Sequence, residues 1–100
     1  MNKFLHVTII PADDREIVDE LSPVFDDAID WLRYAPGCWI VLTNTDPDGW
    51  FARLKPHLKD RDAFFICEIT LTNRRGMLTK QIWEWIHKHV GKRKLLPPQA

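Results

Sequence analysis

The sequence predicts an α+β fold in which one β-sheet organises the whole chain. Three short runs rich in apolar, β-branched and aromatic residues have the length and composition of buried strands: Lys3–Ile10, Cys38–Thr43 and residues 63–71. Stretches with helical spacing separate these runs. The third run is apolar almost throughout, so we expect that strand to be covered on both faces.

The first strand and the first helix are predicted by a proline that ends the strand and by apolar residues that recur at helical spacing. A proline ends the strand Lys3–Ile10, since proline cannot donate to a ladder, and Asp13 or Asp14 is then placed to cap a helix. A helix over residues 14–28 is predicted by apolar residues at helical spacing, which are Ile17, Val18, Leu21, Phe25 and Ala28. Pro23 either kinks this helix or begins a second one, and the sequence favours neither.

The middle of the chain predicts a hairpin and a short second helix. Residues 29–34 either extend the first helix or form a second strand, and the strand is favoured because the turn signal Ala-Pro-Gly joins them directly to the strand Cys38–Thr43. Asp46 followed by Pro47 is a typical helix start. Pro56 limits or kinks the helix that follows.

A third helix is predicted between Thr79, as its cap, and Gly91, as its stop. The order strand, helix, strand, strand, helix, strand, with this helix added, is the ferredoxin-like arrangement. We expect one such domain over residues 1–94 and a tail over residues 95–100. The sheet face away from the first two helices also needs cover, from the third helix or from a second subunit, so a homodimer is expected.

The charges are segregated, although the net charge is zero. Residues 1–30 hold two basic and eight acidic residues, a net charge of −6, and residues 72–100 hold seven basic and one acidic residue, a net charge of +6. Such a distribution steers partners and does not decide the fold.

Cysteine content and hydropathy bear on the compartment. Cys38 and Cys67 both lie in apolar strand runs, which predicts two reduced core thiols and no zinc site. No apolar run is long enough for a membrane span, and the first residues lack the apolar core of a signal peptide. A cytoplasmic protein without a membrane partner is therefore expected.

Four segments between about residues 31 and 87 resemble a known family. They are Tyr34-x-x-Gly37-Cys38-Trp39-Ile40-Val41-x-Thr43, Leu54-Lys55-Pro56-His57-Leu58, Asp62-x-Phe64-Phe65-Ile66-x-Glu68 and Trp83-Glu84-Trp85. This pattern resembles the SinR-like proteins, which are similar to the CRISPR-associated protein two superfamily and to VapD-type ribonuclease toxins. The resemblance implies a ferredoxin-like homodimer. In the nuclease members an aspartate at the end of the first strand binds a divalent metal, and the corresponding residue here is Ile10.

Three carboxylates are candidates for chemistry. Asp13 and Asp14 are potential ligands of Mg²⁺, or else serve the next helix as cap and dipole partner. Glu68, in the middle of a strand, either is buried with a raised pKa that suits acid–base work, or pairs with Arg33 or Arg53, or is exposed.

Two charged surfaces are candidates for binding. An acidic face on the first helix either meets a basic protein or is an ordinary solvated face, and consists of Asp19, Glu20, Asp26, Asp27 and Asp30. A basic set either follows a phosphate backbone, with Trp83 beside it to stack on a base, or forms a solvated helix face and a tail, and consists of Arg74, Arg75, Lys80, Lys88, Lys92, Arg93 and Lys94.

The sequence favours a small binding protein that acts by protein–protein contact without catalysis of its own, such as an immunity protein or an inhibitor. The first alternative is a metal-dependent endoribonuclease of the CRISPR-associated type, which uses Asp13, Asp14 and Glu68. The second is a nucleic-acid-binding protein that uses the basic C-terminal third. No cofactor is expected, apart from Mg²⁺ under the nuclease alternative.

Overall fold

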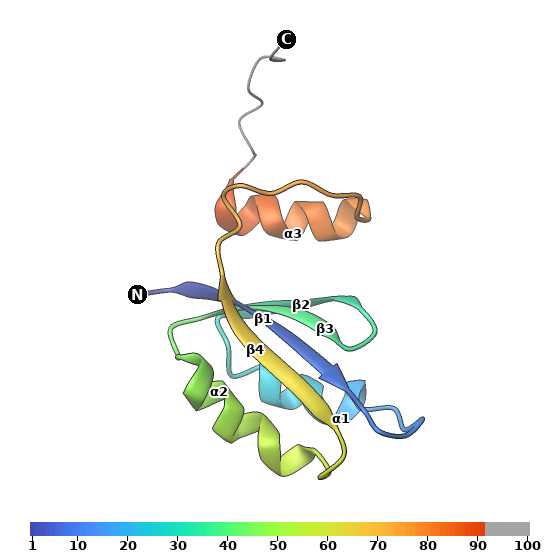
Figure 1. Cartoon of the computed structure of the whole chain (residues 1–100). Helices are drawn as coiled ribbons and strands as arrows, with labels where there is room; N and C mark the ends of the chain where they lie inside the picture. Colours follow the sequence, from blue (N-terminus) through green and yellow to red (C-terminus); the bar gives the residue numbers. More distant parts are fainter. Residues whose placement is uncertain (92–100) are drawn as a thin grey trace. The chain divides into compact units, whose positions relative to one another are not determined.

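The computed structural model of the chain describes residues 1–91, and its backbone groups into two compact units. The first unit is Met1–Ile69 and the second begins at Thr70 (Figure 1). The tail predicted over residues 95–100 lies outside the described residues.

The first unit is a four-stranded antiparallel sheet with two helices. Its elements are β1 (Lys3–Ile10), α1 (Val18–Phe25), β2 (Asp30–Ala35), β3 (Cys38–Thr43), α2 (Pro47–Leu54), the 3₁₀ turn η1 (Lys55–His57) and β4 (Ala63–Ile69). The strand order is β2-β3-β1-β4, and each neighbouring pair is antiparallel. The predicted α+β class is confirmed, and the strand order is compatible with a ferredoxin-like arrangement.

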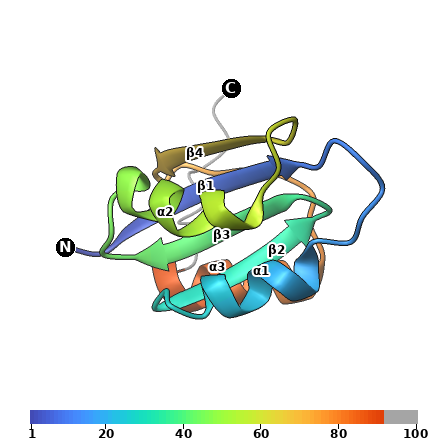
Figure 2. The same cartoon turned by 90° about the horizontal axis from the view of Figure 1, so that it is seen from below.

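Both helices of this unit cover one face of the sheet (Figure 2). The core between the two layers consists of Leu5, Val7, Ile9, Ile17, Leu21, Phe25, Trp39, Val41, Trp50 and Leu54. Phe25 is its centre, with ring centroids 5.0 Å from Trp39 and 6.0 Å from Trp50. Alternation along β1 and β3 thus sends one set of side chains into the core, and we call the opposite face the outer face.

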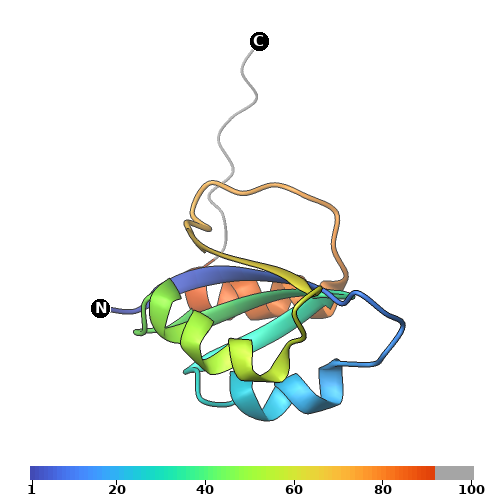
Figure 3. The same cartoon turned by 60° about the horizontal axis from the view of Figure 1, so that its bottom comes forward.

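Helix α1 is shorter than the sequence predicts. It begins at Val18, whereas the apolar period placed its start at residue 14. Neither Asp13 nor Asp14 caps it, so that expectation is wrong, and the carboxylate of Glu16 instead accepts a hydrogen bond from the backbone N–H of Val18 at 3.2 Å. The loop before α1 extends past the end of the sheet (Figure 3).

Pro23 lies inside α1 and does not divide it. Proline has no N–H for the carbonyl one turn earlier, so one helical hydrogen bond is lost. Hydrogen bonds remain on both sides of Pro23: the side-chain hydroxyl of the preceding Ser22 donates to the Val18 carbonyl at 2.8 Å, and the Asp26 N–H donates to the Ser22 carbonyl at 3.0 Å. The alternative of two separate helices is therefore excluded.

Strand β4 is an edge strand of the sheet, paired only with β1 among the described strands. The expectation that it is covered on both faces is wrong, because Phe65 is 63% exposed on the outer face and Cys67 is exposed beside it. Cys67 is therefore not the core thiol that its apolar neighbours predicted. Cys38 is half-buried, and both thiols are free.

The other boundaries agree with the sequence to within two residues. Strand β2 runs one residue later than predicted, and β4 ends at Ile69, two residues early. Asp46 occupies the predicted start of α2, but its side chain pairs with Lys3 and does not cap the helix.

The second unit contains α3 (Lys80–Val90), which lies between Thr79 and Gly91 as predicted. The Thr79 side chain makes no cap hydrogen bond, although the Thr79 carbonyl accepts a hydrogen bond from the backbone N–H of Trp83 at 3.1 Å. Gly91 has a φ of +86°, which ends the helix in a conformation that glycine adopts without strain.

Candidate functional site

A buried carboxylate, Asp62, holds the loop before α1. Its side chain has no exposed surface and accepts hydrogen bonds from the backbone N–H groups of Ala12 at 2.8 Å and Lys59 at 2.7 Å. The Arg15 guanidinium donates to both of its oxygens, through Nη1 at 3.1 Å and through Nη2. The pKa of Asp62 is held well below its usual range, mainly by the hydrogen bonds from Arg15 and further by those from the two backbone N–H groups.

Asp13 belongs to the same ion-pair cluster. Its Oδ1 accepts from the Arg15 guanidinium at 2.9 Å and its Oδ2 lies 3.3 Å from Lys59 Nζ. The Asp13 carboxylate therefore already has two cationic partners. Asp14 is exposed next to it, and within residues 1–91 no three His, Cys, Asp or Glu side chains are close enough together to hold a metal ion.

Glu68 is exposed on the edge strand β4. The acid–base role predicted for it depended on burial, which the structure does not provide. Its charge acts on Lys3, whose pKa is raised mainly by the hydrogen bond to Asp46 and further by Asp46 and Glu68 as charges. The pairings expected with Arg33 or Arg53 do not occur in the described structure.

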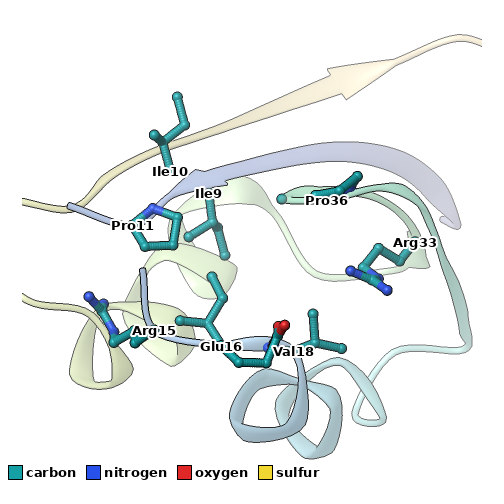
Figure 4. A pocket seen from close by; sticks show the side chains of 10 residues that line it. Ile9, Ile10, Pro11, Arg15, Glu16, Val18, Arg33 and Pro36 are labelled. Carbon is teal, nitrogen blue, oxygen red and sulfur yellow. Dashed lines mark hydrogen bonds between the residues drawn. The ribbon is translucent and has the colours of Figure 1, made fainter. Parts of the chain in front are cut away.

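A pocket of about 360 Å³ lies where β1 ends, at the position that the family resemblance singles out. Its apolar walls include Ile9, Ile17, Val18 and Pro36 (Figure 4). Gly37 completes it at the β2–β3 turn. The Gly37 backbone has a φ of +75°, and an added Cβ would lie 2.4 Å from the Ile9 carbonyl oxygen, so only glycine fits there.

Three charged residues line this pocket: Arg15, Glu16 and Arg33 (Figure 4). Arg15 is engaged by Asp13 and Asp62. Arg33, from β2, makes no hydrogen bond or ion pair with any described residue, so its guanidinium is available to a ligand. Apart from Ile10, no sequence motif predicts the residues that line this pocket, because they come from four separate segments.

The outer face of the sheet carries a polar group within its apolar surface. His6 Nε2 and the Tyr34 hydroxyl are hydrogen-bonded, and Thr8 Oγ1 lies 3.4 Å from His6 Nδ1. Burial lowers the pKa of His6, and burial followed by Cys38 raises the pKa of Tyr34. Both shifts favour the neutral side chains, so this group adds polarity to the face without adding charge at neutral pH.

Two large apolar side chains are exposed at one end of the outer face. Phe65 is 63% exposed on β4 and Ile10 is 60% exposed at the end of β1. Phe65 lies opposite Thr8 and Ile10 opposite Ala63 in the same pair of strands, so the two side chains are near neighbours. Ile10 thus places hydrocarbon at the position where the resemblance would have an aspartate.

Four of the five residues predicted to form the acidic face of α1 are exposed in the structure, all except Asp30. Asp19 and Glu20 lie in the first turn, where the helix dipole favours carboxylates, and Glu20 is 3.3 Å from His57. Asp26 and Asp27 follow the last turn, where the dipole disfavours them.

Two of these acidic residues have local partners. Asp26 accepts a hydrogen bond from Trp31 Nε1 at 2.9 Å. Asp30 lies on β2 and is half-buried, and its carboxylate accepts from the Trp31 N–H at 2.9 Å. The freely exposed carboxylates of the predicted set are therefore Asp19 and Asp27, with Glu20 partly engaged.

In the second unit, Arg74 has a structural role that its place in the predicted basic set did not suggest. Its guanidinium donates to the Leu71 carbonyl at 2.8 Å and to the Gly91 carbonyl at 2.7 Å. It thereby ties the loop after β4 to the C-terminal end of α3, where a cation complements the helix dipole.

The rest of the predicted basic set is divided. Arg75, Lys80 and Lys88 are exposed, and Lys80 lies 3.8 Å from Glu84 on the same helix. Trp83 is half-buried and stacks on His87 at 6.0 Å. The remaining members, Lys92, Arg93 and Lys94, lie outside the described residues.

Comparisons with protein-family models, with curated proteins and with solved structures returned no match to this chain. Among the helices within residues 1–91, none is long and apolar enough to cross a membrane.

Proposed function

We propose that this protein is a small binding protein of ferredoxin-like fold that acts by contact with another protein and has no catalysis of its own. The fold proposal is supported by the strand order β2-β3-β1-β4 and by the two helices that connect β1 to β2 and β3 to β4 on one face of the sheet. The functional proposal concerns the acidic face of α1.

The observation that carries the proposal is the exposed carboxylate of Asp27 after the last turn of α1. A carboxylate at this end opposes the helix dipole, and the last turn holds no basic residue to offset it. The Asp27 backbone N–H donates to the Val24 carbonyl at 3.2 Å, but the Asp27 carboxylate has no hydrogen bond or ion pair with a described residue. The carboxylate of Asp27 therefore does not stabilise α1, whereas a cationic partner protein would give it a favourable interaction.

The partner that suits this face is a protein with a basic surface. Asp19, Glu20 and Asp27 belong to a segment with a net charge of −6 over residues 1–30. Complementary charge of this kind raises association rates and selects partners. An immunity protein or inhibitor directed at a nucleic-acid-binding protein would use such a face, since its acidic residues can stand in for phosphates.

A photo-crosslinking amino acid at position 27 would identify the partner in the native cell. The proposal predicts crosslinks to a protein whose own basic surface meets α1, and it predicts that Asp19→Lys combined with Asp27→Lys abolishes them. The matched control is Asp48→Lys combined with Asp60→Lys, which reverses two exposed acids outside α1. Crosslinks that persist in the Asp19→Lys and Asp27→Lys double variant would contradict the proposal.

The exposed apolar pair Ile10 and Phe65 favours a second proposal, that two copies of the chain meet through the outer face. Sedimentation should then show a dimer that Phe65→Asp dissociates. Phe51→Asp is the control, because Phe51 is also exposed but belongs to α2 on the other side of the sheet. A monomer at all concentrations would contradict this proposal.

The nuclease and nucleic-acid alternatives are separated by one assay. Purified protein is incubated with RNA and with DNA, in Mg²⁺ or Mn²⁺ and then in EDTA. Metal-dependent cleavage that is lost in Asp13→Ala or Asp14→Ala would overturn the non-catalytic proposal. Binding without cleavage that weakens steeply with salt and is lost in Arg75→Glu combined with Lys88→Glu would favour the nucleic-acid-binding alternative.

A further inference from the structure

The pocket at the end of β1 combines an apolar interior with two opposite charges that do not satisfy each other. Glu16 enters from the loop before α1, and Arg33 enters from β2 (Figure 4). The two side chains line the same pocket without forming an ion pair, and neither has an ion-pair partner elsewhere in the described structure. A ligand with one cationic and one anionic group would form ion pairs with both Glu16 and Arg33.

The charged side chains of the pocket differ in how many of their hydrogen-bonding atoms already have a partner. Arg15 donates to Asp62 and to Asp13, so it supplies a fixed wall and little binding capacity. Glu16 uses one oxygen, Oε1, for the Val18 N–H at 3.2 Å, which leaves its second oxygen as an acceptor. Arg33 retains its full set of donors, which match a carboxylate in a two-point contact.

The apolar part of the pocket is built on rigid elements. Ile9 and Ile17 are buried members of the core, and Pro36 and Gly37 form the tight turn whose carbonyl accepts the Ile9 N–H at 2.8 Å. The volume of about 360 Å³ is at the small end of the range for small-molecule sites. A compact branched aliphatic group matches these walls in size and polarity.

We propose that this pocket binds a free α-amino acid with an aliphatic side chain, its carboxylate on Arg33, its ammonium group on Glu16 and its side chain against Ile9, Ile17 and Pro36. Glu16 and Arg33 are both exposed, and a molecule that carries a cation and an anion on one short apolar body can pair with both charges at once. A simple carboxylate would leave Glu16 unpaired and a simple amine would leave Arg33 unpaired, and each would lose a charge-assisted hydrogen bond.

The test is a titration of the purified full chain with L-leucine, followed by the shifts of backbone amide resonances. Saturable shifts are expected at Ile17, Val18 and Gly37. Isocaproate, which lacks the ammonium group, and isopentylamine, which lacks the carboxylate, should each bind at least about tenfold more weakly. No saturation by leucine at ~10 mM, or isocaproate binding as tightly as leucine, would overturn the proposal.

Substitutions assign the two anchors. Arg33→Gln and Glu16→Gln should each weaken leucine binding at least about tenfold, and the glutamine at position 16 still has a carbonyl to accept the Val18 N–H. Arg53→Gln is the control, because Arg53 is also an exposed arginine, and its guanidinium lies over the Trp50 ring rather than in the pocket. Equal weakening by Arg53→Gln would contradict the assignment of Arg33 as the anchor.

Discussion

Both carboxylate oxygens of Asp62 accept hydrogen bonds from the guanidinium of Arg15, and the Asp62 side chain is fully buried in that contact. The two residues are 47 positions apart in the chain. Their contact, with the backbone bonds from Ala12 and Lys59, holds the β1–α1 loop against the loop before β4. It therefore positions Glu16, which enters the pocket from that loop.

Replacing Asp62 by Asn should destabilise the protein strongly. The amide keeps the size of the side chain but directs an NH₂ group at donors, so at least one of the four hydrogen bonds to this carboxylate is lost and a charge partner of Arg15 disappears. Urea denaturation should show a much lower midpoint for Asp62→Asn than for Asp60→Asn, an exposed neighbour. Equal midpoints for the two variants would contradict this role of Asp62.

The same carboxylate makes stability depend on pH. Arg15 lowers the pKa of Asp62 in the folded protein below the ordinary value of 3.8, so the unfolded chain binds this proton more readily. The contribution of Asp62 to the free energy of unfolding is complete at neutral pH and is lost as the pH falls below about 4, toward the native pKa.

Urea midpoints measured from about pH 6 down to about pH 3 test this dependence. The difference between the wild-type protein and Asp62→Asn should shrink as the pH falls, because asparagine has no proton to gain. A difference that stays constant or grows over this range would show that the pKa of Asp62 is not lowered.

Much of the fold could be predicted because local signals and tertiary contacts agree. The strand bounds Lys3–Ile10 and Cys38–Thr43 are correct, since apolar alternation and flanking turns both specify them. The start of α1 was wrong by four residues because a contact 47 positions away ties Arg15 to Asp62. No local pattern contains that contact.

The candidate site was less predictable for the same reason. Four of the five acidic residues predicted for the first helix lie in α1 or directly after it, so they could be named from spacing, whereas Asp30 lies on β2. The pocket unites residues from β1, the loop before α1, β2 and the β2–β3 turn, and Arg33 gave no sign of its position there. The burial of β4 was overestimated because composition does not reveal that a strand lies at the edge of a sheet.

Thr43 should contribute to stability through its hydroxyl. Thr43 is buried, and its Oγ1 accepts from Trp50 Nε1 at 3.1 Å and from the Thr45 N–H at 3.1 Å. Thr43→Val keeps the shape but leaves the indole N–H of Trp50 buried without a partner, which costs about 1–3 kcal/mol. Denaturant unfolding should show this loss for Thr43→Val and a smaller one for Thr43→Ser, which keeps the hydroxyl. A larger loss of unfolding free energy in Thr43→Ser than in Thr43→Val would indicate that the threonine methyl group contributes more to stability than the hydroxyl.

Gly37 should not tolerate a side chain. Alanine at this position combines a φ of +75° with a Cβ 2.4 Å from the Ile9 carbonyl oxygen, so Gly37→Ala should lower the free energy of unfolding by more than about 1 kcal/mol. Gly76→Ala is the comparison, because an added Cβ at Gly76 meets no atom within 4 Å. Thermal unfolding of the two variants measures the difference, and similar melting temperatures would contradict the close approach at the β2–β3 turn.

The association rate with the protein captured at position 27 tests the proposed function most directly, measured by stopped flow over a range of salt concentrations. The acidic-face proposal predicts that the rate falls steeply with salt, and that Asp19→Lys combined with Asp27→Lys reduces it at least about tenfold at low salt. The control pair Asp48→Lys and Asp60→Lys should change it far less. A rate that is insensitive to salt and to charge reversal on α1 would contradict the claim that this face binds a basic protein.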